Sequence, residues 1–166
     1  PLLYLKSPLS LGGQAGGSVA HTAGVINAML ACGRDVDFVS AETPILLSEG
    51  VGLRAVPAPR TYGLPPEVNL YGFQHRFAEQ ARAFCEERDY AFVYQRLTLG
   101  SYAGVAVSRA AALPLVLEYN GPEAWAAMHW GTPLRYARLA EQAEDVSLAH
   151  AHLVVVVSEG LRDQLV

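Results

Sequence analysis

The chain has 166 residues, of which 51% are hydrophobic and 17% are charged, and its formal net charge is −4. This composition is typical of one packed globular domain and excludes a disordered chain. A nucleic-acid surface normally carries a basic stripe, so the negative charge argues against one. The two cysteines, Cys32 and Cys85, are far apart in the sequence. They are expected as buried thiols, and not as a disulfide framework or a zinc site.

In the first half of the chain, short apolar runs alternate with one helical pattern. Between the first two runs, residues 19–32 repeat apolar side chains at three- and four-residue spacing, which predicts an amphipathic helix. Ser18 is its expected N-cap, and Gly33 lies where a glycine commonly ends a helix. The apolar runs predict three strands, over residues 2–5, 35–41 and 50–58.

The second half continues this alternation after a proline-rich loop over residues 57–66. Thr132 is the expected N-cap of the helix over 132–151, with Pro133 at its first position. Ser158 is the expected cap of a last helix, which the end of the sequence interrupts. The remaining helices are expected over 67–88 and 101–112, and the strands over 90–96, 113–120 and 152–159.

This order of elements, with strands that are continuously apolar, is typical of a parallel sheet covered by helices on both faces. We therefore expect an α/β fold with a doubly wound, Rossmann-like parallel sheet in a single domain. The strand order should be 3-2-1-4-5-6, with strands numbered along the chain. Ligands of such sheets bind outside the carboxyl ends of the strands, so candidate residues are sought there.

A glycine-rich loop, Gly12 to Gly17, joins the first expected strand to the first expected helix. Glycines let backbone N–H groups approach a ligand closely, and a helix N-terminus favours an anion such as a phosphate. The alternative is a turn that binds nothing. The glycines fit neither the dinucleotide fingerprint G-x-G-x-x-G nor a P-loop, although Glu42 lies where the ribose acid of an NAD site would be.

Polar side chains are expected near the same edge of the sheet. His21, on the first turn of the first helix, is either a neutral hydrogen-bonding group for a ligand or an ordinary exposed residue. Arg96 pairs either with an anionic ligand or with a nearby acid. Glu118 ends an apolar strand, and we favour an orientation toward the cleft over one satisfied by backbone donors. The loop over 124–133 either closes over a ligand or packs against the protein.

Three stretches resemble family 4 glycosyltransferases: residues 12–42 (GGQAGG…VSAE), 92–123 (FVYQR…LVLEYNGPE) and 153–166 (LVVVVSEGLRDQLV). The resemblance implies a GT-B architecture, in which two Rossmann-like domains face each other across a cleft. Residues 1–166 would then be the N-terminal, acceptor-side domain, interrupted at its C-terminal end. The family usually retains anomeric configuration and needs no metal. Where many members carry a His after the fifth strand, this sequence has Asn120-Gly121-Pro122.

The resemblance also implies roles for individual residues. Glycines of the loop would approach the donor diphosphate, and side chains at the strand ends would border the acceptor. The resulting candidates are Glu118, Asn120 and His21 as catalytic residues, Gly16 and Gly17 as donor phosphate-binding residues, and Arg96 and Ser18 as acceptor-binding residues.

The leading hypothesis is the N-terminal domain of a retaining glycosyltransferase that moves a sugar from a nucleotide-sugar donor to an acceptor. This chain alone should be inactive. Its expected partners are the nucleotide sugar, a sugar, lipid or small-molecule acceptor, and the missing C-terminal domain, with no cofactor, metal or nucleic acid. We expect a cytoplasmic location, with contact with the inner face of the membrane as an option. The alternatives are a nicotinamide-dependent oxidoreductase domain and a non-enzymatic nucleotide- or sugar-binding module.

Overall fold

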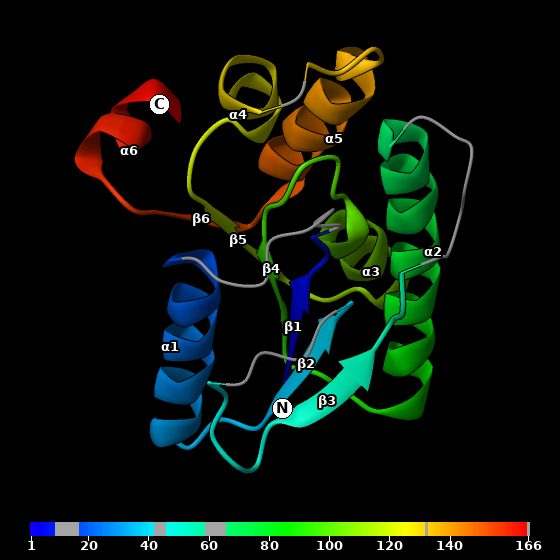
Figure 1. Ribbon diagram of the computed structural model, residues 1–166. Helices are drawn as coiled ribbons and strands as arrows, with labels where there is room; N and C mark the ends of the chain where they lie inside the picture. The colour runs from blue at the N-terminus through cyan, green and yellow to red at the C-terminus, as the bar shows by residue number, and fades with distance from the viewer. Residues whose placement is uncertain (9–16, 42–45, 59–65, 132, 166) are drawn as a thin grey trace.

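The computed structural model describes residues 1–8, 17–41, 46–58, 66–131 and 133–165. Within these ranges the strands form one six-stranded sheet in the order β3-β2-β1-β4-β5-β6, and every neighbouring pair is parallel (Figure 1). This confirms the doubly wound, Rossmann-like fold and the expected strand order. The strands are β1 (Leu2–Lys6), β2 (Val36–Ser40), β3 (Gly52–Ala55), β4 (Val93–Arg96), β5 (Leu115–Tyr119) and β6 (Leu153–Val156).

Helices cover both faces of the sheet. Figure 1 shows α1 on one side of the sheet and α2 and α3 on the other. Leu3 and Leu5 of β1 pack with Phe73 of α2, whereas Tyr4 packs with Ile26 of α1, because successive strand side chains point to opposite faces. The helices are α1 (Gly17–Ala31), α2 (Pro66–Glu87), α3 (Ala103–Ala111), α4 (Glu123–Trp130), α5 (Ala137–His150) and α6 (Glu159–Leu165).

Two helix ends form as the sequence predicts. Gly33 has a φ of 74°, the left-handed conformation that glycine adopts without strain just beyond a helix. Ser158 caps α6, since its Oγ accepts a hydrogen bond from the backbone N–H of Leu161 at 3.2 Å.

Other local expectations are wrong. Ser18 lies inside α1, which begins at Gly17, and its carbonyl accepts a bond from Thr22 Oγ1 at 2.8 Å. Pro133 lies outside α5, which begins at Ala137, and Thr132 is outside the described residues. Helix α5 therefore begins four residues later than its proline suggested.

The expected loop over 124–133 is also wrong for most of its length, because α4 spans Glu123–Trp130. The segment contains three alanines and a methionine, which are strong helix formers.

The burial expected for the two cysteines is wrong as well. Cys32 is exposed and Cys85 is only partly buried, so the two are not the buried pair expected from free cysteines.

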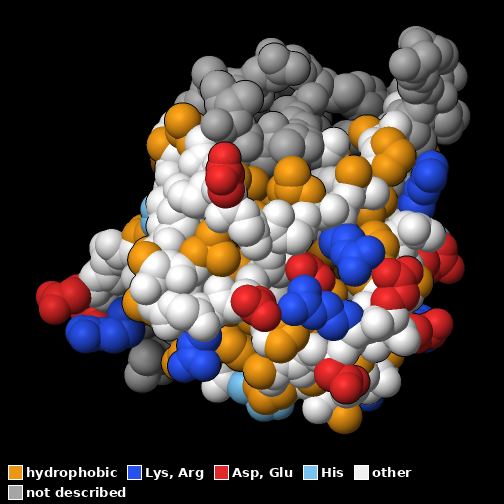
Figure 2. Space-filling model, turned by 90° about the horizontal axis from the view of Figure 1, so that it is seen from below, with side chains coloured by type: hydrophobic (Ala, Val, Ile, Leu, Met, Phe, Trp, Pro, Cys, Tyr) orange, Lys and Arg blue, Asp and Glu red, His pale blue; other side chains and the backbone are white. Residues whose placement is uncertain are grey.

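The amino ends of β1, β2 and β3 lie toward the lower end of the molecule in Figure 1. Viewed from there, acidic and basic side chains are interspersed (Figure 2). Asp37 of β2 is buried at this end and accepts bonds from Arg88 Nη1 at 2.9 Å and from the Tyr90 hydroxyl at 2.6 Å. The pairing ties the start of β2 to the segment that leads from α2 into β4.

None of the helices in the described part of the chain has the length and apolar character needed to cross a membrane.

Candidate functional site

The candidate residues meet at the carboxyl ends of the central strands because of the sheet register. Arg96 of β4 lies opposite Glu118 of β5, and Tyr94 lies opposite Tyr4 of β1. Tyr94 and Arg96 are two residues apart, so their side chains share one face of the sheet. This is the face that α1 covers, and His21 on the second turn of α1 reaches the same point.

Glu118 is the centre of this group, and only 1% of it is exposed. We call Glu118 and its partners the Glu118 cluster. The groups within hydrogen-bonding distance of its carboxylate are Asn120 Nδ2 at 2.8 Å, His21 Nε2 at 3.0 Å, the Tyr94 hydroxyl at 3.0 Å, the Tyr4 hydroxyl at 3.3 Å, and Arg96 Nη1.

The surroundings keep this carboxylate ionised. Burial by itself raises the pKa of Glu118, but the bond from Asn120, the Arg96 charge, the Tyr94 hydroxyl and His21 outweigh it and lower the pKa below 4.5. Burial and the Glu118 charge raise the pKa of the Tyr94 hydroxyl, which stays neutral and donates. Glu118 is therefore a fixed anion at neutral pH.

The Glu118 cluster also settles two alternatives that the sequence leaves open. Glu118 is buried, so the favoured orientation toward an open cleft is wrong. Among the described residues its partners are side-chain donors from several elements, and not backbone donors. Arg96 pairs with this acid. His21 is 3.0 Å from it, with 41% of its side chain exposed. Glu118 therefore orients Arg96, His21 and Asn120, and His21 can still reach a ligand.

Two of the remaining predicted site residues lie at the start of α1. Gly17 and Ser18 are exposed on its first turn, and Lys6 Nζ donates to the Ser18 carbonyl at 3.4 Å. The structure does not bring the Ser18 side chain into the Glu118 cluster. Gly16, the rest of the glycine loop and Glu42 lie outside the described residues.

Sequence reasoning missed Tyr4 and Tyr94. Each is a buried tyrosine, and a buried hydroxyl needs a hydrogen-bond partner. That need was the available signal, although it does not identify Glu118 as the partner. The two rings also stack, with centroids 4.9 Å apart.

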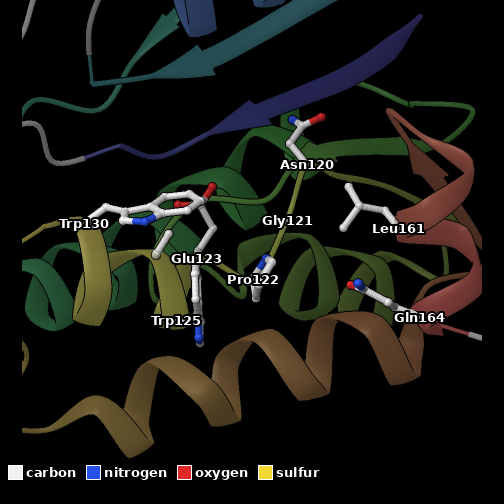
Figure 3. A pocket seen from close by; sticks show the side chains of 9 residues that line it. Asn120, Gly121, Pro122, Glu123, Trp125, Trp130, Leu161 and Gln164 are labelled. Atoms are coloured by element: carbon white, nitrogen blue, oxygen red, sulfur yellow. The ribbon is translucent and has the colours of Figure 1, made fainter.

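A pocket of about 620 Å³ lies beside the Glu118 cluster, at the carboxyl end of β5, between α4 and α6. Figure 3 shows Glu123 and Trp130 on the α4 side, and Leu161 and Gln164 on the α6 side. Asn120 lines this α4–α6 pocket and also bonds Glu118, so it joins the two parts of the site.

Glu123 is a second carboxylate that the sequence analysis did not select, because an acid after a proline is an ordinary start to a helix. Burial and the nearby charge of Glu144 raise its pKa to about 6, against a smaller opposite effect of Arg96. Glu144 accepts bonds from Tyr119 and from the backbone N–H of Ala124. Glu118 and Glu123 thus have pKa values shifted in opposite directions.

In the described ranges, no group of three or more His, Cys, Asp or Glu residues could hold a metal ion.

Comparison with known families gives a match over most of the chain. The model of the family described as "Glycosyl transferase 4-like domain" matches residues 16–166. This match confirms the resemblance seen in the three sequence stretches. No curated protein sequence matches the chain.

Solved structures with a similar fold include three proteins. A sucrose-phosphate synthase from Thermosynechococcus elongatus has a TM-score of 0.73 and 17% identity, over 99% of this chain and 44% of that one. UGT73P12 of Glycyrrhiza uralensis, complexed with glycyrrhetinic acid 3-O-monoglucuronide, has a TM-score of 0.63 and 14% identity, over 98% and 45%. MurG of Acinetobacter baumannii has a TM-score of 0.58 and 11% identity, over 94% and 41%. The chain spans less than half the length of each.

Proposed function

Since the chain belongs to the glycosyl transferase 4-like domain family, we propose that it is the N-terminal, acceptor-side half of a two-domain, GT-B glycosyltransferase. A second domain binds a nucleotide sugar in this proposal, and the sugar moves to the acceptor across the cleft with retention of configuration. The coverage of 41 to 45% of each similar structure supports a second half of comparable size. The family match favours this function over an oxidoreductase domain or a non-enzymatic binding module.

The observation that carries the proposal is the Glu118 cluster. One buried anion fixes a guanidinium, an imidazole and an amide at the edge of the sheet where doubly wound folds bind ligands. Donors that are already oriented stabilise developing charge without reorganising during the reaction. We assign substrate contact to His21 and Asn120, and a positioning role to Glu118 because it is buried.

On the donor side, the proposal places the diphosphate at the N-terminus of α1. The orphan backbone N–H groups of a helix start favour an anion there. Gly17 is the first residue of α1, and a Cβ atom added to it would have no heavy atom within 4 Å. Among the described residues, no other atom therefore occupies the space beside Gly17, which is open to a ligand. Gly16 is assigned the same role from the family resemblance.

The test is a transfer assay on the proposed two-domain protein with a panel of nucleotide sugars and acceptors. We expect transfer with the anomeric configuration of the donor retained, as read by NMR of the product. This chain alone is the control and should be inactive, because most donor contacts belong to the second domain. An assay with EDTA checks that no metal ion is needed. Absence of transfer from every nucleotide sugar, or full activity of this chain alone, would contradict the proposal.

A further inference from the structure

The α4–α6 pocket has a lining that selects for one kind of ligand. Its wall contains two indole rings, a proline and a leucine, together with the Asn120 amide and the Glu123 carboxylate at the end of β5 and the Gln164 amide on the α6 side. Among the residues that the structure describes, no lysine, arginine or histidine lines it. The lining residues are Asn120, Gly121, Pro122, Glu123, Trp125, Ala126, Trp130, Leu161 and Gln164.

One atom in this wall lacks a hydrogen-bond partner. Asn120 Oδ1 is buried, and among the described residues it is the buried side-chain oxygen or nitrogen without a partner. Its orientation is fixed, because Asn120 Nδ2 donates to Glu118 at 2.8 Å and a flipped amide would place two oxygens against each other. A buried acceptor without a donor costs free energy, so a donor from a ligand accounts for it.

Glu123 provides further acceptor capacity. In the described part of the chain no group donates a hydrogen bond to its carboxylate, and its electrostatic neighbours are Glu144 and Arg96. Glu144 by contrast is satisfied by Tyr119 and a backbone N–H. At the end of β5 the polar groups with spare capacity, Asn120 Oδ1 and the Glu123 carboxylate, are thus acceptors, which favour a ligand that donates.

The tryptophans provide an apolar platform. Trp130 is 80% exposed, and its ring meets that of Trp125 edge to face at 4.9 Å. A sugar ring has an apolar C–H face that stacks on an indole and hydroxyl groups that donate at its edge. A phosphate or nucleotide would instead place negative charge beside Glu123, with no cation among the described residues of the lining.

We propose that the α4–α6 pocket binds an uncharged sugar, stacked on Trp130 and donating hydroxyl hydrogen bonds to Asn120 Oδ1 and the Glu123 carboxylate. This sugar is the acceptor, a role that rests on the proposed glycosyltransferase function. Asn120 then links the bound acceptor to the Glu118 cluster. The volume of about 620 Å³ lies within the range of small-molecule sites, roughly 300–1,000 Å³.

The chain supplies its own probe for this site, because both of its tryptophans line the pocket. Tryptophan emission of the chain would be titrated with neutral methyl glycosides and disaccharides, and with the matching sugar phosphates. We expect a saturable change with at least one neutral sugar, and binding at least about fivefold weaker for its phosphate. Trp130→Ala should weaken binding at least about tenfold, with Trp125 as the remaining reporter. Glu123→Gln should weaken it several-fold.

Glu86→Gln is the matched control, because Glu86 is an exposed acid on α2 far from the pocket. It should bind as the unchanged chain does. Trp130 is exposed, so its removal should leave the melting curve unchanged and the variant interpretable. The proposal is overturned if no neutral sugar gives a saturable change, if the phosphates bind more tightly, or if Trp130→Ala retains full affinity.

The transfer assay separates this proposal from the broader one. Sugar binding without transfer in the two-domain protein would leave the pocket as a sugar site and refute its role as the acceptor site. Transfer by the two-domain protein without binding of any neutral sugar to this chain would refute the sugar site in the pocket and leave the glycosyltransferase function standing.

Discussion

Replacing Glu118 by glutamine removes the one charge around which the Glu118 cluster is built. The amide keeps one oxygen, which can still accept from Arg96, His21 and Asn120. Its NH2 group would face the two tyrosine hydroxyls, which can turn and accept. Most hydrogen bonds therefore survive in Glu118→Gln, and the main loss is the charge.

The size of this loss follows from the burial of the ion pair. The Arg96 side chain is 12% exposed and that of Glu118 is 2% exposed. Removing one partner of a buried pair costs about 3–5 kcal/mol. Since the amide preserves most contacts, we expect about 2–3 kcal/mol of lost unfolding free energy at neutral pH.

The pH dependence gives the signature of a charge effect. The pKa of Glu118 is lower in the folded protein than in the unfolded chain. The stability it contributes is therefore present above the unfolded pKa of about 4.5 and is lost as the pH falls through the folded value. The difference between the unchanged chain and Glu118→Gln should accordingly shrink on acidification.

Urea denaturation at pH 7 and at about pH 4 measures both quantities. Glu86→Gln, an exposed acid on α2, should change stability by less than about 0.5 kcal/mol at either pH. A loss below about 0.5 kcal/mol for Glu118→Gln at pH 7 would refute the reasoning. So would a loss that is equal at both pH values, because it would then come from packing.

Three further predictions concern other positions. Gly17→Val should lower turnover of the proposed two-domain enzyme at least about 100-fold, whereas Gly24→Val on the same helix should leave turnover unchanged. A Cβ atom at either position meets no heavy atom within 4 Å, so both variants should keep the melting temperature of the unchanged protein. Equal turnover of the two would contradict the phosphate role. Glu123→Gln should stabilise the chain by about 1–2 kcal/mol at pH 8, because the folded pKa of about 6 exceeds the unfolded one. This gain should shrink toward pH 5 in urea titrations, and a gain independent of pH would exclude its electrostatic origin. Gly104→Ala should cost about 1–3 kcal/mol in the same assay, since its Cβ would lie 2.8 Å from Leu115 Cδ1; unchanged stability would mean that α3 can shift.

The sequence by itself determined the elements and the topology. Hydrophobic runs and helical spacing are local signals, and each of the six expected strands is present in the structure. The strand order was expected from the common doubly wound arrangement together with right-handed crossovers, and the structure confirms it. Helix ends with a local chemical reason, such as Gly33 and Ser158, also formed as predicted. Two ends predicted from the same kinds of residue, the Ser18 cap and the Pro133 start, did not form there, so the type of a capping residue alone does not fix a helix end.

Tertiary structure alone decided which polar groups meet. Tyr4 and Glu118 are 114 positions apart, and they touch because strand register places them on one face near the same edge. No local pattern specifies such a contact, since the same tyrosine on the other face would have met α2. The α4–α6 pocket likewise joins the end of β5 to two helices whose relative position depends on packing. Such neighbours also set the pKa of a carboxylate. Glu118 and Glu123 are only five residues apart, yet the pKa of Glu118 is lowered and that of Glu123 is raised.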